Sequence, residues 1–347
     1  MTTLSRRRFL RTSGMGVGAT MATSLLSSAR AGAATEKELI PRKFPFPPND
    51  QYGNYEPTIT ADGNTIYFAR FASGGDKRVH GDTSDILVTH RIRKGGDWPG
   101  SGDQWTAPER LPDTVNSGTT DQEPWISPDG RTLYFMSRRP GGHGEADIYV
   151  SYKQPNGGWT KAENLGPNVN SKYFDHCFMP SGIPGEENVA VFASIRPREP
   201  GAAPSADIYT TKLERGIWQP AKRIESKLVD SIGFKCRLVS VAKDGMVLGV
   251  MSVHDFGKFH KLVFVHYDLS AKQWKGPVVE APFNLANVDG ACPMFQPGGD
   301  IMLWSSGQDR GPGAISTADG TGGSVYDLFW LKTGDMIAYY RAKAGLK

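Results

Sequence analysis

Carboxylates and a histidine recur at the start of short apolar segments, where they are candidates for acid–base chemistry. Glu56, Glu123 and Asp175 hold what looks like an equivalent position in related segments, and His176 directly follows Asp175. Carboxylates that lie close together separate in pKa, so that one donates a proton and another accepts it. If the segments converge, we predict Glu123 and Asp175 as an acid–base pair, with His176 as a third catalytic residue.

Basic side chains follow the next apolar segment in several of the same units. Guanidinium groups bind carboxylate, sulfate or phosphate groups through paired hydrogen bonds, so we predict that Arg138 and Arg196 orient an anionic ligand. The other ligand-binding candidates lie at segment starts or in nearby loops: Glu56, Arg139, His143, Lys235, Asp289 and Arg310. A structural role stays open for all of them, because ion pairs between neighbouring sheets use the same residue types.

The three cysteines, Cys177, Cys236 and Cys292, also lie near segment starts and raise the question of a metal site. Their spacing contains no Cys-x-x-Cys element, and three cysteines cannot all pair with one another. Buried free cysteines commonly act as small apolar residues, which is the role we expect here. The sequence identifies no cofactor and leaves a bound metal open.

The unit that positions these side chains is clearest in residues 123–151. It contains an apolar segment, the turn Ser127-Pro128-Asp129-Gly130, a second apolar segment that includes Leu133-Tyr134-Phe135, and Asp147-Ile148-Tyr149 after a Gly-rich loop. Tight hairpins require positive φ, which Asp and Gly tolerate. The pattern predicts short antiparallel strands joined by tight turns.

Related units recur five times, beginning near residues 56, 123, 175, 236 and 292. One small sheet cannot bury both of its faces, so a series of sheets predicts a closed radial array. We therefore predict an all-β, five-bladed β-propeller with four-stranded antiparallel blades, formed by residues 34–347 as a single domain. Tryptophans at the start of the outer strands are expected to pack between blades: Trp105, Trp159, Trp218 and Trp274.

The fifth unit has no Trp-x-x-Pro segment after Asp327 that would form an outer strand. The residues before the first unit match such a segment, because Pro41, Phe44 and Asn49 correspond in spacing to Pro108, Leu111 and Asn116. We predict that residues 41–46 complete the fifth blade and remove its open edge. Residues 336–341 are the alternative.

Residues 1–33 are predicted to be a twin-arginine signal peptide. They contain Ser5-Arg6-Arg7-Arg8-Phe9-Leu10, a modestly apolar run and small residues at Ala29, Ala31 and Ala33. The apolar run is too short for a stable membrane span. Removal of the five leader arginines takes the formal charge of +4 to about −1, which argues against a nucleic-acid partner. We expect a monomer that is periplasmic or secreted.

The motif Glu-Pro-x-x-Ser-Pro-Asp-Gly-x-x-Leu-Tyr-Phe, with Asp-Ile-Tyr downstream, resembles the WD40-like PD40 repeat of TolB-type periplasmic propellers. The resemblance covers nearly all of the mature chain and is strongest in residues 123–151. It implies a propeller that binds a ligand or a protein of the cell envelope. Such repeats specify a fold far better than a function.

We therefore predict that the protein binds a ligand or partner at the polar mouth of its central channel, on the face formed by the segment starts. The alternative is a hydrolase or lyase that acts on an acidic saccharide or another anionic small molecule, with inner-strand carboxylates as acid and base. Carboxylates that face each other across a pocket would favour the enzyme. Carboxylates that each pair with the neighbouring blade would favour the binding role.

Overall fold

The computed structural model describes residues 39–45, 47–50, 52–71, 83–95, 102–180, 182–183, 185–254, 260–283, 290–306 and 326–346. The chain divides into two units, Met1–Glu36 and Lys37–Lys347. The first unit, which contains the predicted signal peptide, lies outside the described residues. Within the described part, no helix is long and apolar enough to cross a membrane.

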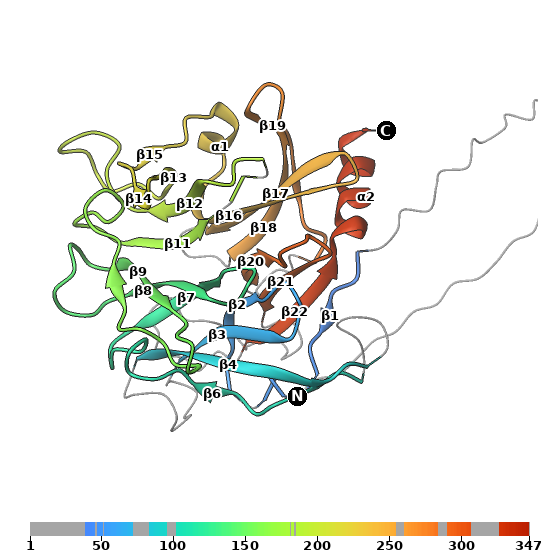
Figure 1. Cartoon of the computed structure of the whole chain (residues 1–347). Helices are drawn as coiled ribbons and strands as arrows, with labels where there is room; N and C mark the ends of the chain where they lie inside the picture. The colour runs from blue at the N-terminus through green and yellow to red at the C-terminus, as the bar shows by residue number, and fades with distance from the viewer. Residues whose placement is uncertain are drawn as a thin grey trace, which may run out of the picture. The chain divides into compact units, whose positions relative to one another are not determined.

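The described residues of the second unit form five antiparallel sheets (Figure 1). The first sheet contains β2 (Tyr55–Ile59), β3 (Thr65–Phe71), β4 (Ser84–Arg93), β5 (Gln104–Trp105) and β6 (Glu109–Arg110). The second contains β7 (Asp121–Ile126), β8 (Thr132–Ser137), β9 (Asp147–Tyr152) and β10 (Glu163–Asn164). The third contains β11 (Asp175–Pro180), β12 (Val189–Ser194), β13 (Asp207–Glu214), β14 (Ile217–Trp218) and β15 (Lys222–Arg223).

The fourth sheet contains β16 (Phe234–Lys243), β17 (Met246–His254), β18 (His260–Asp268) and β19 (Gln273–Glu280). The fifth contains β20 (Gly290–Phe295), β21 (Ile301–Ser306), β22 (Asp327–Lys332) and, from the start of the chain, β1 (Arg42–Lys43). The short helix α1 (Lys227–Ser231) precedes the fourth sheet, and α2 (Thr333–Ala344) follows the fifth. The prediction of an all-β, five-bladed β-propeller is confirmed.

The N-terminal strand completes the fifth blade, as predicted. Arg42 pairs with Trp330 in β22, and Figure 1 shows the blue strand β1 beside β22. The side-chain amide of Asn49 also bonds to both the N–H and the C=O of Leu328, at 2.7 and 3.0 Å. The alternative segment, residues 336–341, lies in α2, where Met336 and Tyr340 are buried. The propeller is therefore closed by the first described strand of the chain.

Tight turns and interblade aromatic contacts explain why the repeats fold in this way. Gly130 has a φ of 70°, and the Asp129 carboxylate accepts a hydrogen bond from the main chain of Arg131 at 3.1 Å, which stabilises the hairpin. Trp159 of the second blade packs edge-on against Tyr67 of the first, with ring centroids 6.1 Å apart. Such contacts bury large aromatic surfaces between sheets, in agreement with the predicted packing role of the tryptophans.

Each innermost strand carries a β-bulge at an equivalent place. The pairing register shifts at this point in β2, β7, β11, β16 and β20. The bulged segments contain Glu56, Glu123, Cys177, Cys236 and Cys292, respectively. Four of these residues have φ between 55° and 58°: Glu56, Glu123, Cys177 and Cys292. Residues other than glycine rarely adopt this left-handed conformation, and it occurs preferentially at functional sites.

Candidate functional site

The bulges bring together a buried group of polar side chains from all five blades, which we call the inner-strand ring. It consists of Glu56, Glu123, His176, Cys177, Arg237 and Cys292. Each of these residues is at most 8% exposed. Buried ionisable groups are costly unless they bond to one another, so their mutual contacts decide what the ring can do.

The two glutamates join neighbouring blades through main-chain hydrogen bonds. Glu56 Oε2 accepts a bond from the N–H of Glu123 at 2.7 Å, and Glu123 Oε2 accepts one from the N–H of Cys177 at 2.6 Å. The Cys292 thiol lies 3.6 Å from Glu56 Oε1. The left-handed bulge residues thus present their N–H groups to the carboxylate of the preceding blade, so that each glutamate is oriented by the adjacent blade.

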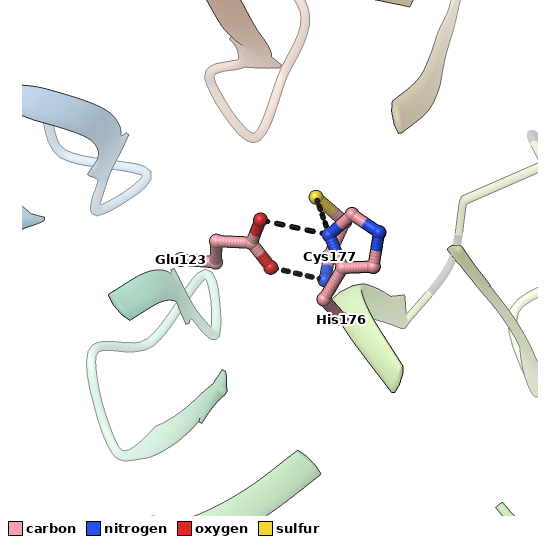
Figure 2. A group of neighbouring side chains, drawn as sticks. All are labelled: Glu123, His176 and Cys177. Atoms are coloured by element: carbon pink, nitrogen blue, oxygen red, sulfur yellow. Dashed lines mark hydrogen bonds and ion pairs between the residues drawn. The ribbon is translucent and has the colours of Figure 1, made fainter. Parts of the chain in front are cut away.

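His176 and Glu123 form a dyad within the ring. Figure 2 shows His176 Nδ1 directed at Glu123 Oε1, 2.9 Å away, while its other ring nitrogen points away from the carboxylate. An ionised carboxylate can only accept, so Nδ1 donates, and Nε2 is able to accept a proton whenever the ring is in its neutral form. Cys177 Sγ lies 3.4 Å from the same Nδ1. This is the geometry of a general base that is oriented by a carboxylate.

Arg237 places a positive charge in the middle of this group. Its Nε donates to Cys177 Sγ at 3.2 Å, and its buried Nη1 finds no hydrogen-bond partner among the described residues. Burial lowers the pKa of Arg237, but Cys177, Cys292 and the two glutamates outweigh burial and raise it above its usual value. Arg237 therefore keeps its charge and interacts with both carboxylates.

The surroundings separate the two glutamates in pKa. Burial, followed by the negative charge of Glu123, raises the pKa of Glu56 from 4.5 to about 7. Burial also raises the pKa of Glu123, but the charge and hydrogen bond of His176, with Arg237, outweigh it and hold this pKa at about 2. Burial raises the pKa of the Cys177 thiol well above its usual value. Near neutral pH, the ring holds one protonatable carboxyl group and one ionised carboxylate.

A pocket of about 320 Å³ lies on the face of the tight turns, two residues along the innermost strands from the ring. Its lining residues include four that follow ring residues by two positions on the same strands: Trp125, Met179, Val239 and Met294. The ligand was predicted on the face formed by the segment starts, whereas a pocket of this size on the face of the tight turns can also take a small ligand. Part of the opposite face, where the ligand was predicted, lies outside the described residues.

The register corrects the predicted equivalence of Asp175 with Glu56 and Glu123. Asp175 pairs with Ser194 as Asp121 pairs with Ser137, so Asp175 corresponds to Asp121. Its Oδ2 accepts a bond from the Ser171 hydroxyl at 2.7 Å, and its Oδ1 accepts one from Arg196 at 2.6 Å. These bonds give Asp175 a structural position outside the ring. Its catalytic role stays a prediction that the geometry does not favour.

The predicted arginines and His143 also lie outside the ring. Arg196 binds the Val169 carbonyl as well as Asp175, and Arg139 makes the corresponding bond to Asp121 at 2.8 Å. Arg138 is exposed, with its guanidinium 5.1 Å from the Phe174 ring. His143 is exposed in its loop. Ligand binding by these residues remains a prediction.

Three predicted ligand-binding residues remain, and the structure describes one of them. Lys235 is buried, and its Nζ donates to the carbonyls of Ile232 and Gly233 at 3.0 and 3.1 Å and lies 3.6 Å from Asp207 Oδ1, so these groups compensate its charge. Asp289 and Arg310 lie outside the described residues. The residues that the structure gathers from the prediction are therefore Glu56, Glu123 and His176.

Sequence reasoning did not assign Arg237 or the cysteines to the site. A usable signal was present, because Cys292-Pro293 repeats the pairs Glu56-Pro57 and Glu123-Pro124 at the same distance before the turn. Cysteine at that position replaces a carboxylate, not an apolar residue. The nitrogen, sulfur and carboxylate ligand atoms of His176, Cys177 and Glu123 all lie within 4.8 Å of one another, so these residues could also hold a metal ion.

Comparison with protein-family models gives no match, and neither does comparison with characterised proteins. Solved structures do match. An alpha-L-arabinofuranosidase from Lactobacillus brevis is 10% identical with a TM-score of 0.52, and the match covers 80% of this chain and 90% of that one. The RS223-Beta-xylosidase is 12% identical with a TM-score of 0.51, over 84% and 94% of the two chains. These likenesses are of fold alone.

A putative TolB from Agrobacterium tumefaciens is 16% identical with a TM-score of 0.40, over 74% of this chain and 70% of that one. The β-propeller part of the predicted resemblance is confirmed by the five sheets. A relation to TolB-type proteins in particular stays a prediction.

Proposed function

We propose that this protein is an exported hydrolase that cleaves a saccharide or a related small polar molecule at the inner-strand ring. One observation carries the proposal: a protonatable carboxyl group, Glu56, lies beside a carboxylate–histidine dyad, Glu123 and His176, in one buried group. Pairs of groups whose surroundings separate their pKa values are the usual basis of acid–base catalysis.

The roles follow from the contacts. Glu56, with a pKa of about 7, donates a proton to the leaving oxygen of the substrate. His176 Nε2 removes a proton from water, and Glu123 orients the imidazole and stabilises the imidazolium that forms. The pocket lined by Trp125 and Met179 provides room for the substrate. The same acid and base would serve a lyase, in which the base removes a proton from the substrate itself.

The substrate class has weaker support than the site. Two chains of the same fold are described as an arabinofuranosidase and a xylosidase, and both names refer to saccharides. The predicted preference for an anionic substrate now depends on Arg237, because Arg139 and Arg196 are engaged within their own blades. Export through the twin-arginine route to the periplasm remains part of the proposal and depends on residues 1–33.

A non-catalytic binding protein of the cell envelope is the second candidate. It is favoured by the main-chain bonds that tie Glu56 and Glu123 to the next blade, the arrangement that we expected for a binding role. In that case the ring would stabilise the propeller, and the pocket would receive a ligand without turnover.

Activity against a panel of aryl glycosides, including arabinofuranosides, xylosides and glucuronides, distinguishes the two candidates. For a hydrolase, Glu56→Gln and His176→Ala are each expected to lower kcat by roughly 10² to 10⁴-fold. Lys212→Ala is the control, because Lys212 is exposed on β13 and pairs with Glu214 rather than with a ring residue. A ligand-induced rise in Tm with no turnover by the wild type would support the binding protein and contradict the hydrolase.

A further inference from the structure

We propose that Glu123, His176 and Cys177 bind a thiophilic divalent metal ion such as Zn²⁺, and that the bound metal inhibits the reaction at the ring. The inhibitory part rests on the proposed function, whereas the binding part does not. One carboxylate oxygen, one imidazole nitrogen and one thiol sulfur from two adjacent blades converge, as Figure 2 shows, with all ligand atoms within 4.8 Å of one another. Zinc is bound by these three ligand types.

The spacing of the ligand atoms is close to that of a tetrahedral site. With Zn–N and Zn–O near 2.0–2.1 Å and Zn–S near 2.3 Å, neighbouring ligand atoms lie about 3.3 Å (N and O) and about 3.6 Å (N and S) apart. The observed separations are 2.9 Å between His176 Nδ1 and Glu123 Oε1, and 3.4 Å between Nδ1 and Cys177 Sγ. These two separations differ from the tetrahedral values by about 0.4 Å and about 0.2 Å. The ligand atoms of Glu123 and Cys177 lie within 4.8 Å of each other.

Arg237 provides a supporting contact to this group of three ligands. Arg237 Nε donates to Cys177 Sγ at 3.2 Å. Hydrogen bonds of this kind stabilise metal-bound thiolates and orient them.

The charges of the occupied site balance. A divalent ion neutralises the Glu123 carboxylate and the Cys177 thiolate, which leaves Arg237 to be balanced by an ionised Glu56. Charge balance of this sort is required of a buried site. Soft and borderline metals are favoured over Mg²⁺ and Ca²⁺, because two of the three ligands are an imidazole and a thiol.

Inhibition follows from which atoms the metal would occupy. Coordination through His176 Nδ1 moves the proton of this nitrogen to Nε2, which can then no longer accept a proton, and Cys177 loses its thiol proton to solvent. Glu123 can then no longer support the imidazole as a general base. The metal-free ring is thus the active form, and the metal-bound ring is the inactive one.

Co²⁺ is a suitable probe, because thiolate coordination gives it a near-ultraviolet charge-transfer band that does not depend on turnover. The folded protein is freed of metal with a chelator and titrated with Co²⁺. We expect one equivalent to bind with a thiolate band, and Cys177→Ser to lose the band and to weaken binding by roughly 100-fold. Arg237→Met is expected to retain the band but to weaken binding by roughly 10 to 100-fold.

His90→Ala is the matched control, because His90 is an exposed histidine on β4 and its loss is expected to leave Co²⁺ uptake unchanged. Circular dichroism confirms that each variant is folded. A wild type without a thiolate band, or equal Co²⁺ affinity in Cys177→Ser and the wild type, would overturn the site. Binding with unchanged turnover would overturn the inhibitory part alone. Binding by a protein that turns over nothing would support the site and contradict the hydrolase.

Discussion

Replacement of Glu56 by glutamine is predicted to stabilise the metal-free protein above neutral pH while it removes the catalytic proton. The pKa of Glu56 rises from 4.5 to about 7 on folding, because the side chain is buried next to the charge of Glu123. A raised pKa means that the folded state holds the proton more tightly than the unfolded state. The stabilisation from this proton is complete below pH 4.5 and is lost as the pH rises through about 7.

The size of the effect follows from the two pKa values. The difference between 4.5 and about 7 corresponds to about 3 kcal/mol in the free energy of unfolding, at 1.36 kcal/mol for each pH unit. Solvent screens little of this, because Glu56 is only 8% exposed. Glutamine keeps a side-chain oxygen that can accept the N–H of Glu123, but it carries no charge. The variant therefore avoids the loss of folding free energy that the wild type undergoes at high pH when the buried Glu56 ionises.

Glu123→Gln is the matched variant and has the opposite sign. The pKa of Glu123 is lowered to about 2, so its charge contributes stability above pH 4.5 that is lost as the pH falls through about 2. We expect this variant to be less stable than the wild type at pH 8.5, because Arg237 and the hydrogen bonds from His176 and Cys177 favour the ionised carboxylate. Urea unfolding of the wild type and both variants at pH 5 and pH 8.5, with a chelator present, measures the difference. Equal destabilisation by both variants at pH 8.5 would refute the reasoning.

The remaining predictions concern residues that stabilise the blades and the closure of the propeller. Asn116→Ala removes the buried amide that bonds to the N–H and C=O of Ile86, and should cost about 2–4 kcal/mol in thermal or urea unfolding. Phe44→Ala opens a cavity where the first strand closes the propeller, and the free energy of unfolding is expected to fall by about 3–5 kcal/mol. An unchanged Tm would speak against this closure. Burial raises the pKa of Asp207, but the Arg198 hydrogen bond and the charge of Lys235 outweigh burial and lower it below 3.8. The stability that the ionised Asp207 contributes is therefore lost as the pH falls below 3.8. The free energy of unfolding of Asp207→Asn should depend less steeply on pH in acid than that of the wild type.

The fold was predictable because its determinants are local and repeated. Asp129-Gly130 dictates a hairpin through the conformations that these two residues tolerate, and each blade closes in the same way. The closing strand was also predictable, since Asn49 holds the same place in the repeat as Asn116. Both asparagines bond to the main chain of a third strand, Leu328 and Ile86, respectively. Because both asparagines make the same hydrogen bonds, they have the same spacing to the neighbouring repeat residues, and this spacing identified the strand.

The site was predictable only in part, because it depends on contacts between distant strands. Glu123 and His176 come from different blades and meet only when the propeller forms. The bulges also change which residue faces inward, and periodicity alone assigned this position to Asp175 when Cys177 holds it. Arg237 was not among the predicted site residues, because its burial beside Cys177 results from packing across the ring.

Comparison among the blades separates structural residues from candidates for chemistry. The Asp–Arg pair recurs with the same contacts in the second and third blades, as Asp121–Arg139 and Asp175–Arg196. Side chains that repeat together with their partners serve each blade equally, so no single pair is set apart for a reaction. The bulge position behaves differently: its left-handed backbone is retained, while the side chain changes from glutamate in β2 and β7 to cysteine in β11 and β20. A strained conformation that is retained under different side chains points to a role for the ring as a whole. Acid–base chemistry and metal binding both need different kinds of side chain close together, and the ring brings such side chains together.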